Sequence, residues 1–155
     1  MEGSEADLHR KAQAQQLGDM VRESRRTWIM FLLMIYAIPA LIWAVYVLTD
    51  TSAVANTIWT NADLQSWFAS HTEVTYDTIA TYITASGVMI AVSGGCALIS
   101  FICCYLRRYW IVAVAACFLA AFFCISSIFG VIVGIFVGWM IITAKDTFTA
   151  PLKSV

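Results

Sequence analysis

Charged residues are scarce in this chain. They make up 12% of its 155 residues, whereas soluble domains average about 25%. Hydrophobic residues make up 61%, and the mean hydropathy is +0.78. So few charged side chains cannot cover the surface of a water-soluble fold, but lipid tails are themselves apolar and accept such a surface. The composition excludes an ordinary soluble domain and predicts a membrane protein.

Basic patches and reaction motifs are also missing. Range 1–26 holds five acidic and five basic residues, so it lacks the basic face that nucleic-acid binding requires. The sequence has no glycine-rich phosphate loop and no HExxH motif, and its carboxylate pairs at helical spacing, such as Asp19 and Glu23, all lie outside the predicted spans. Its five cysteines form no CxxC pair, and cysteines in apolar helices usually act as small hydrophobes. We predict no catalytic, cofactor-binding or metal-binding residue, no nucleic-acid partner and no enzymatic activity.

Apolar segments of membrane-spanning length follow the N-terminal region. The first, at 28–48, has no charged residue over 21 positions, and about 20 apolar residues cross a bilayer core as a helix. A second span is predicted at 83–105, after a polar first turn. Pro39 lies inside the first span, where a membrane helix tolerates it.

The uncharged stretch 109–144 is too long for one crossing. As a single helix it would measure about 54 Å, against a hydrocarbon core of about 30 Å. We therefore predict two spans, at 109–126 and 128–144, that turn tightly near Ser126–Ser127 and Gly130. A re-entrant hairpin is the alternative for this pair.

Lysine and arginine lie on one side of the predicted spans. They precede the first span, join the second to the third and follow the fourth, whereas the 50–77 loop has none. The positive-inside rule then places both termini and the joint between the second and third spans in the cytoplasm. The residues that set this orientation are Arg25, Arg26, Arg107, Arg108 and Lys145.

The N-terminal region 1–26 is predicted to be helical and to run into the first span. It has no proline and is rich in good helix formers, but its apolar stripe is thin. The interpretations are a solvated tail, a helix that only aids orientation, or a docking helix for a partner or for other copies. The stripe residues are Leu8, Leu17, Met20, Val21 and Trp28.

The outer loop 50–77 contains a short amphipathic pattern. Leu64, Trp67 and Phe68 have the i, i+3, i+4 spacing of one helical face, and Thr60 or Asn61 can cap that helix. An amphipathic helix lying in the outer membrane interface is the first interpretation. A recognition cap for a partner subunit is the second.

Small residues recur at four-residue spacing within two predicted spans. Such rows let helix backbones approach closely in a membrane. They predict either packing within one bundle or, for the last span, association between copies. The predicted packing residues are Gly130, Gly134, Gly138, Gly87, Ala91 and Gly95.

The layout resembles the tetraspan plan of claudin-like and MARVEL-type proteins, with a larger outer loop after the first span. The claudin-like motif needs Trp-Leu-Trp and two cysteines in that loop, which has no cysteine, so no residue role carries over. Arg107-Arg108-Tyr109-Trp110 and Lys145-Asp146-Thr147-Phe148 are similar to motifs of small uncharacterised prokaryotic membrane proteins with four helices. That resemblance covers roughly Gly87–Phe148 and implies the topology only.

The sequence thus predicts an all-α, four-transmembrane-helix bundle with both termini in the cytoplasm. Region 1–26 forms a cytoplasmic helix, and 27–155 forms the domain in the cytoplasmic or plasma membrane. A structural or accessory function is expected, through helix packing with itself or a larger complex, with lipid as the surroundings. A small homo-oligomeric channel is the alternative, because hydroxyl side chains lie along the outer half of the second span and could line a path if copies assemble. These are Thr78, Thr81, Thr84, Ser86 and Ser93.

Overall fold

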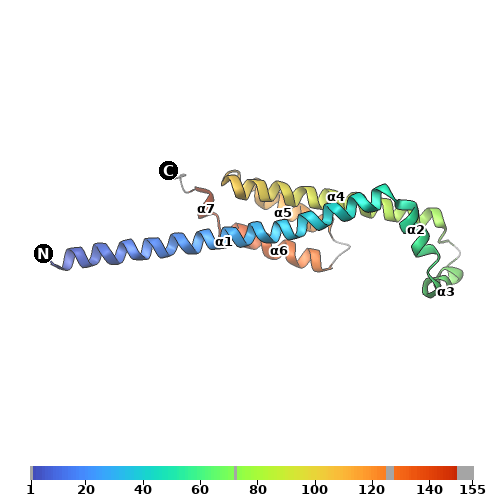
Figure 1. The fold of residues 1–155 in the computed structure, drawn as a ribbon, viewed down its shortest axis with the longest axis horizontal. Coiled ribbons are helices and arrows are strands. Elements are labelled where there is room, and N and C mark those ends of the chain that lie inside the picture. Colours follow the sequence, from blue (N-terminus) through green and yellow to red (C-terminus); the bar gives the residue numbers. More distant parts are fainter. Residues whose placement is uncertain (1, 72, 125–127, 150–155) are drawn as a thin grey trace.

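The structure, a computed structural model, describes residues 2–71, 73–124 and 128–149. Its helices are α1 (Glu2–Thr49), α2 (Thr51–Trp59), α3 (Ala62–Ser70), α4 (Tyr76–Leu106), α5 (Trp110–Phe123), α6 (Ile128–Thr143) and α7 (Asp146–Thr149) (Figure 1). No described residue lies in a strand, so the all-α prediction is confirmed. Helices α1 and α4 are long and apolar enough to cross a membrane, and the apolar helices α5 and α6 are shorter.

Helix α1 joins the predicted N-terminal helix to the first apolar segment without a break. Its 48 residues, with Pro39 inside, span about 72 Å at 1.5 Å per residue. The bundle covers only the C-terminal part of this length, and the N-terminal part projects beyond the other helices (Figure 1).

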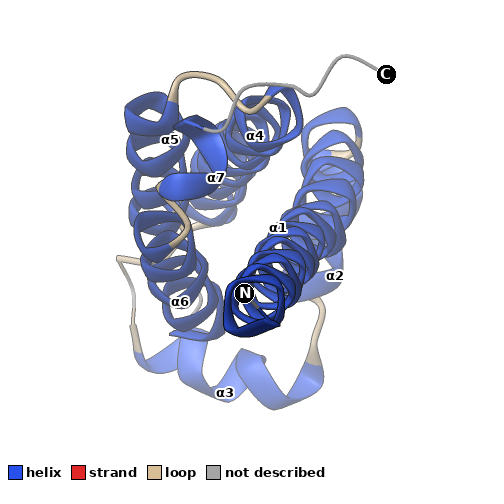
Figure 2. Ribbon diagram, turned by 90° about the vertical axis from the view of Figure 1, so that its left-hand side faces the viewer, coloured by secondary structure: helices blue, strands red, loops and turns tan. Residues whose placement is uncertain are grey.

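Helices α1, α4, α5 and α6 form the bundle. Helix α1 packs against α4, α4 against α5 and α5 against α6, with a smaller contact between α6 and α1 (Figure 2). Many of the buried residues at these contacts are small, which lets the helices lie close together. The small members of this core are Ala37, Ala97, Cys103, Cys104, Ala113, Cys117, Ala120 and Ala144.

Helices α5 and α6 are shorter than the spans predicted at 109–126 and 128–144. They have 14 and 16 residues, about 21 Å and 24 Å in length. Arg107 and Tyr109 adopt left-handed backbone conformations, with φ of 54° and 57°. Helix α4 therefore ends before Arg107, and α5 begins only after Tyr109, at Trp110. The predicted turn at Ser126–Ser127 lies outside the described residues.

The outer loop is more helical than the sequence pattern indicated. Asn61 caps α3 by accepting a hydrogen bond from the Asp63 N–H over 2.9 Å, so the predicted helix and one of its two candidate caps are confirmed. Helix α2 was not predicted. Asp50 caps it by accepting from the Ala53 N–H over 3.3 Å, which starts a new helix immediately after α1.

Glycines of α6 contact α5 within the same chain. A Cβ atom built on Gly134 would lie 2.5 Å from the Ala121 Cβ, and one on Gly138 would lie 3.2 Å from the Phe118 ring. The α5 and α6 backbones therefore approach closely at Gly134. Gly130, the third glycine of the row, is buried.

Two glycines of α4 contact α1, but only one of them is a glycine that the four-residue pattern predicted. A Cβ on Gly87 would lie 3.0 Å from Val47 Cγ1, and one on Gly94 would lie 2.9 Å from Leu41 Cγ. Gly95 has nothing within 4 Å of such an atom, so the close approach is made by Gly94 instead. Ala91 is half-buried. A seven-residue spacing, two helical turns, brings residues 87 and 94 onto the face that meets α1.

Replacing Gly134 with alanine should push α5 and α6 apart. We expect Gly134→Ala to lower the free energy of unfolding by about 1–3 kcal/mol because the added methyl group overlaps Ala121. Gly95→Ala is the matched control, since its Cβ has open space and alanine favours a helix over glycine by about 1 kcal/mol. Thermal unfolding in detergent measures both, and equal stabilities would contradict this packing.

Candidate functional site: interhelical contacts and the two ends of the bundle

Two fully buried serines of α4 bond directly to the backbone of α5. The Ser93 hydroxyl donates to the Ala120 carbonyl over 2.7 Å, and the Ser100 hydroxyl donates to the Ala113 carbonyl over 2.9 Å. Both serines are 0% exposed. The two donors are seven residues apart on α4, and the two acceptors are seven residues apart on α5. The later donor bonds to the earlier acceptor, as expected for antiparallel helices, so the two bonds fix the register of α4 against α5.

Tyr36 extends this contact to α1. Its hydroxyl oxygen lies 2.5 Å from Ser93 Oγ. Because the Ser93 hydrogen points to the Ala120 carbonyl, the Tyr36 hydroxyl donates to Ser93. A continuous hydrogen-bonded chain thus links α1, α4 and α5, and it satisfies polar groups for which an apolar surrounding offers no other partner.

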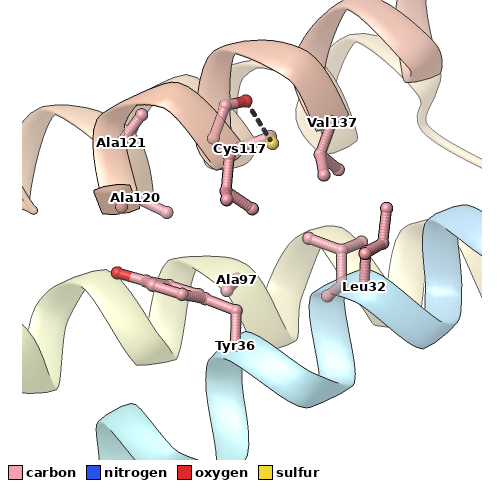
Figure 3. Close-up of a pocket in the computed structure, with 11 residues that line it drawn as sticks. Leu32, Tyr36, Ala97, Cys117, Ala120, Ala121 and Val137 are labelled. Atoms are coloured by element: carbon pink, nitrogen blue, oxygen red, sulfur yellow. Dashed lines mark hydrogen bonds between the residues drawn. The ribbon is translucent and has the colours of Figure 1, made fainter. Parts of the chain in front are cut away.

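A small cavity lies between α1, α4, α5 and α6 (Figure 3). Its volume of about 20 Å³ has room for one water molecule, which needs about 10–15 Å³. Its lining is apolar, because the Tyr36 hydroxyl is bonded to Ser93 and the Cys117 thiol donates to the Gly134 carbonyl over 3.5 Å. Ligand sites are typically about 300–1,000 Å³, so this cavity is too small for a substrate.

The hydroxyl groups that suggested a pore all have partners within the chain. Three of them bond to carbonyl groups of their own helix, one pairs with a neighbouring threonine, and Ser93 makes the bond to α5 described above. Serine and threonine hydroxyls commonly make such bonds within helices, so they do not by themselves indicate a pore lining. Besides the Ser93 bond, the hydrogen bonds are those of Thr81 to the Asp77 carbonyl, Thr84 to the Ala80 carbonyl, Ser86 to the Ile83 carbonyl, and Thr78 with the Thr75 hydroxyl.

The basic residues that the sequence predicts to set the orientation lie at one end of the bundle, which we call the basic end. Arg107 Nη2 donates to Glu23 Oε1 over 3.1 Å, and Arg26 Nη2 lies 3.7 Å from the same oxygen. These contacts tie the α4–α5 joint to α1. Arg25 and Arg108, the other two arginines of the set, are exposed.

Lys145, after α6, lies at the same end. Its Nζ atom is 5.3 Å from the centre of the Trp110 ring, close enough for a cation–π interaction. The Trp110 Nε1–H donates to the Ile141 carbonyl over 3.0 Å. The start of α5 and the end of α6 are therefore joined beside the arginines.

Helices α2 and α3 cover the opposite end of the bundle, and we call them the cap. The Trp59 ring stacks on Phe68 with centroids 5.3 Å apart and meets the edge of Tyr76 at 6.3 Å. Phe68 is thus half-buried, whereas Leu64 and Trp67 are 39% and 50% exposed. The predicted three-residue face is divided: Phe68 packs inward on Trp59, Leu64 is exposed, and Trp67 lies at the surface with its ring against Phe68 at 5.6 Å and His71 at 4.3 Å.

No protein-family model matches the chain, and neither a curated protein nor a solved structure does. In the described ranges, no group of three or more His, Cys, Asp or Glu residues could hold a metal ion.

Sequence reasoning missed Ser100, Tyr36 and Glu23. The equal seven-residue spacing of Ser93–Ser100 and Ala113–Ala120 is a signal that could have found the first. Tyr36 and Glu23 act through partners 57 and 84 residues away, and no local pattern indicates such pairings.

Removing either interhelical serine bond should destabilise the bundle. We expect Ser93→Ala and Ser100→Ala each to lower the free energy of unfolding by about 0.5–1.5 kcal/mol, as is usual for interhelical hydrogen bonds in membranes. Ser86→Ala is the control, because that hydroxyl bonds only to its own helix. Unfolding in mixed micelles measures all three, and losses at Ser86 as large as at Ser93 would argue against a special role for these bonds.

Proposed function

We propose that this protein is a four-span integral membrane protein with both termini in the cytoplasm. In this proposal it serves as a structural or accessory subunit, and it associates through helix packing with other copies or with a larger membrane complex. The interior contacts described above would hold the bundle together, and the exposed part of α1 would make the external contact.

The exposure of the apolar helices supports a membrane location. In the most apolar 18-residue windows of α1 and α4, only 22% and 39% of the residues are buried. The core helix of a soluble protein is mostly buried, because water disfavours exposed apolar side chains. Large apolar side chains are instead exposed on all four bundle helices, among them Ile42, Val88, Ile111, Phe122 and Ile132.

The distribution of charge supports the orientation. The cap and its connections carry Asp50, Asp63, Glu73 and Asp77 but no lysine or arginine, while the basic end lies at the other end of the bundle (Figure 1). Cytoplasmic segments are the ones enriched in lysine and arginine. The pair formed by α5 and α6 starts and finishes at the basic end, which fits two short crossings and a re-entrant hairpin alike.

The projecting part of α1 is the observation that carries the accessory function. Leu17, Met20 and Val21 are 63%, 62% and 55% exposed. They belong to the N-terminal part of α1, the part that projects beyond the bundle (Figure 1). Isolated helices are marginally stable in water and gain most of their stability by packing an apolar face. A second helix against these side chains would supply that packing.

The glycine row of α6 is less suited to association between copies. Gly134 and Gly138 already contact α5 of the same chain, so this face is occupied. The structure thus favours the bundle-packing interpretation of the row and leaves α1 as the external surface.

Labelling with a membrane-impermeant maleimide tests the orientation. In a cysteine-free background, we expect Asn56→Cys in the cap to react in intact cells, and Tyr109→Cys to react only after the membrane is opened. A cysteine introduced between α5 and α6 should react from outside if both helices cross, but not if they form a re-entrant hairpin. Labelling of Tyr109→Cys in intact cells would overturn the orientation.

Size measurements after gentle extraction from the native membrane test the function. We expect the chain to migrate in a complex larger than a monomer, and the combined change Leu17→Gln, Met20→Gln and Val21→Gln to release it. Gln15→Ala with Asp19→Ala changes the opposite face of α1 and should leave the complex intact. A lone wild-type monomer would refute the accessory function, and an unchanged complex in the triple variant would refute the role of α1.

A further inference from the structure

Two arginines from different segments converge at the basic end. Arg107 and Arg26 both approach Glu23 Oε1, at 3.1 Å and 3.7 Å. Their side chains are only 26% and 19% exposed, whereas that of Glu23 is 64% exposed. One carboxylate therefore faces two largely covered guanidinium groups, and its single negative charge cannot balance both.

The Arg26 guanidinium also lacks hydrogen-bond acceptors. Its Nε atom is buried and has no partner among the described residues. The 3.7 Å separation from Glu23 is too long for a hydrogen bond from Nη2. Covering charged donors without providing acceptors is costly, so an oxygen-rich anion beside this group would be stabilised.

The surroundings have the same excess of positive charge. Ranges 19–26, 107–108 and 145–146 together hold six basic and three acidic residues. Of the arginines, Arg22 approaches Asp19 only at 4.0 Å. The acidic residues of the cap lie at the opposite end of the bundle (Figure 1).

We propose that the basic end binds the phosphate group of an anionic phospholipid in the cytoplasmic leaflet, held between Arg26 and Arg107. Guanidinium groups present paired N–H donors that match phosphate oxygens, and two of them can hold one phosphate from two sides. The inference rests on the proposed function, because that membrane orientation brings the basic end to the cytoplasmic headgroups.

Neighbouring apolar residues favour a lipid over a free phosphate ion. Leu106, next to Arg107 in the chain, is 51% exposed, and Met30, one turn after Arg26 on the same face of α1, is half-buried. An acyl chain attached to the bound phosphate would lie along such side chains, whereas an inorganic ion gains nothing from them. Basic pockets between membrane helices on the cytoplasmic side are a common form of lipid headgroup site.

Thermal unfolding of the full chain in an uncharged detergent tests this site. Three probes are compared: short-chain phosphatidylglycerol, phosphatidylcholine with the same acyl chains, and inorganic phosphate. We expect phosphatidylglycerol to raise the Tm by about 3–5 °C at roughly ten times its Kd. Phosphatidylcholine has the same phosphate but adds a choline cation, which the excess positive charge repels, so its shift should be much smaller. Inorganic phosphate should leave the Tm unchanged.

Charge-matched variants locate the effect. Arg26→Gln and Arg107→Gln should each abolish the phosphatidylglycerol shift, whereas Arg25→Gln removes an equal but exposed charge and should preserve it. Glu23→Gln removes the competing carboxylate and should lower the Tm without lipid but enlarge the shift. This last variant provides a test even where the arginine variants do not fold.

Several results would overturn the lipid site. They are a missing phosphatidylglycerol shift, a shift that persists in Arg26→Gln and Arg107→Gln, an equal loss in Arg25→Gln, or the same shift with inorganic phosphate.

Alkaline carbonate extraction of native membranes separates the two proposals. Release of the wild-type chain refutes the proposed membrane function, whereas a retained chain without the selective shift refutes the lipid site alone.

Discussion

Neighbouring helices approach most closely where side chains are small or missing, and the rest of the structure depends on this contact. Gly134 against Ala121 joins α6 to α5, and Gly87 and Gly94 join α4 to α1. In a bilayer, lipid offers apolar side chains the same surroundings as another helix, so helices associate through close van der Waals contact and hydrogen bonds. Shape at these positions therefore matters more than hydrophobicity.

The close approach also makes the interior hydrogen bonds possible. Ser93 and Ser100 reach carbonyl groups of α5 at 2.7 Å and 2.9 Å because the two backbones are near each other. Tyr36 then connects α1 to the same contact. Packing and hydrogen bonding thus support one another, and the polar groups concerned are satisfied inside the bundle rather than lining a path through it.

The two ends of the bundle differ in charge and in construction. The cap is acidic and is held by aromatic contacts around Trp59. The basic end is held by Glu23 between two arginines and by Lys145 against Trp110. The same contacts that close the bundle at this end leave positive charge in excess, so they share their residues with the proposed lipid site.

Composition and hydrophobic pattern by themselves determined the helical class, the long apolar helices and the short helix that contains Leu64, Trp67 and Phe68, because each depends on neighbours within a few turns. The structure selected Asn61 over Thr60 as the cap of that short helix. The tertiary structure decided which small residues touch another helix. Gly94 and Gly95 are adjacent glycines in an apolar helix, yet only Gly94 faces α1, and Arg26 and Arg107 share one carboxylate although 80 residues separate them. Such pairings depend on how whole helices rotate and pack against each other, which is a property that no local stretch of the chain contains.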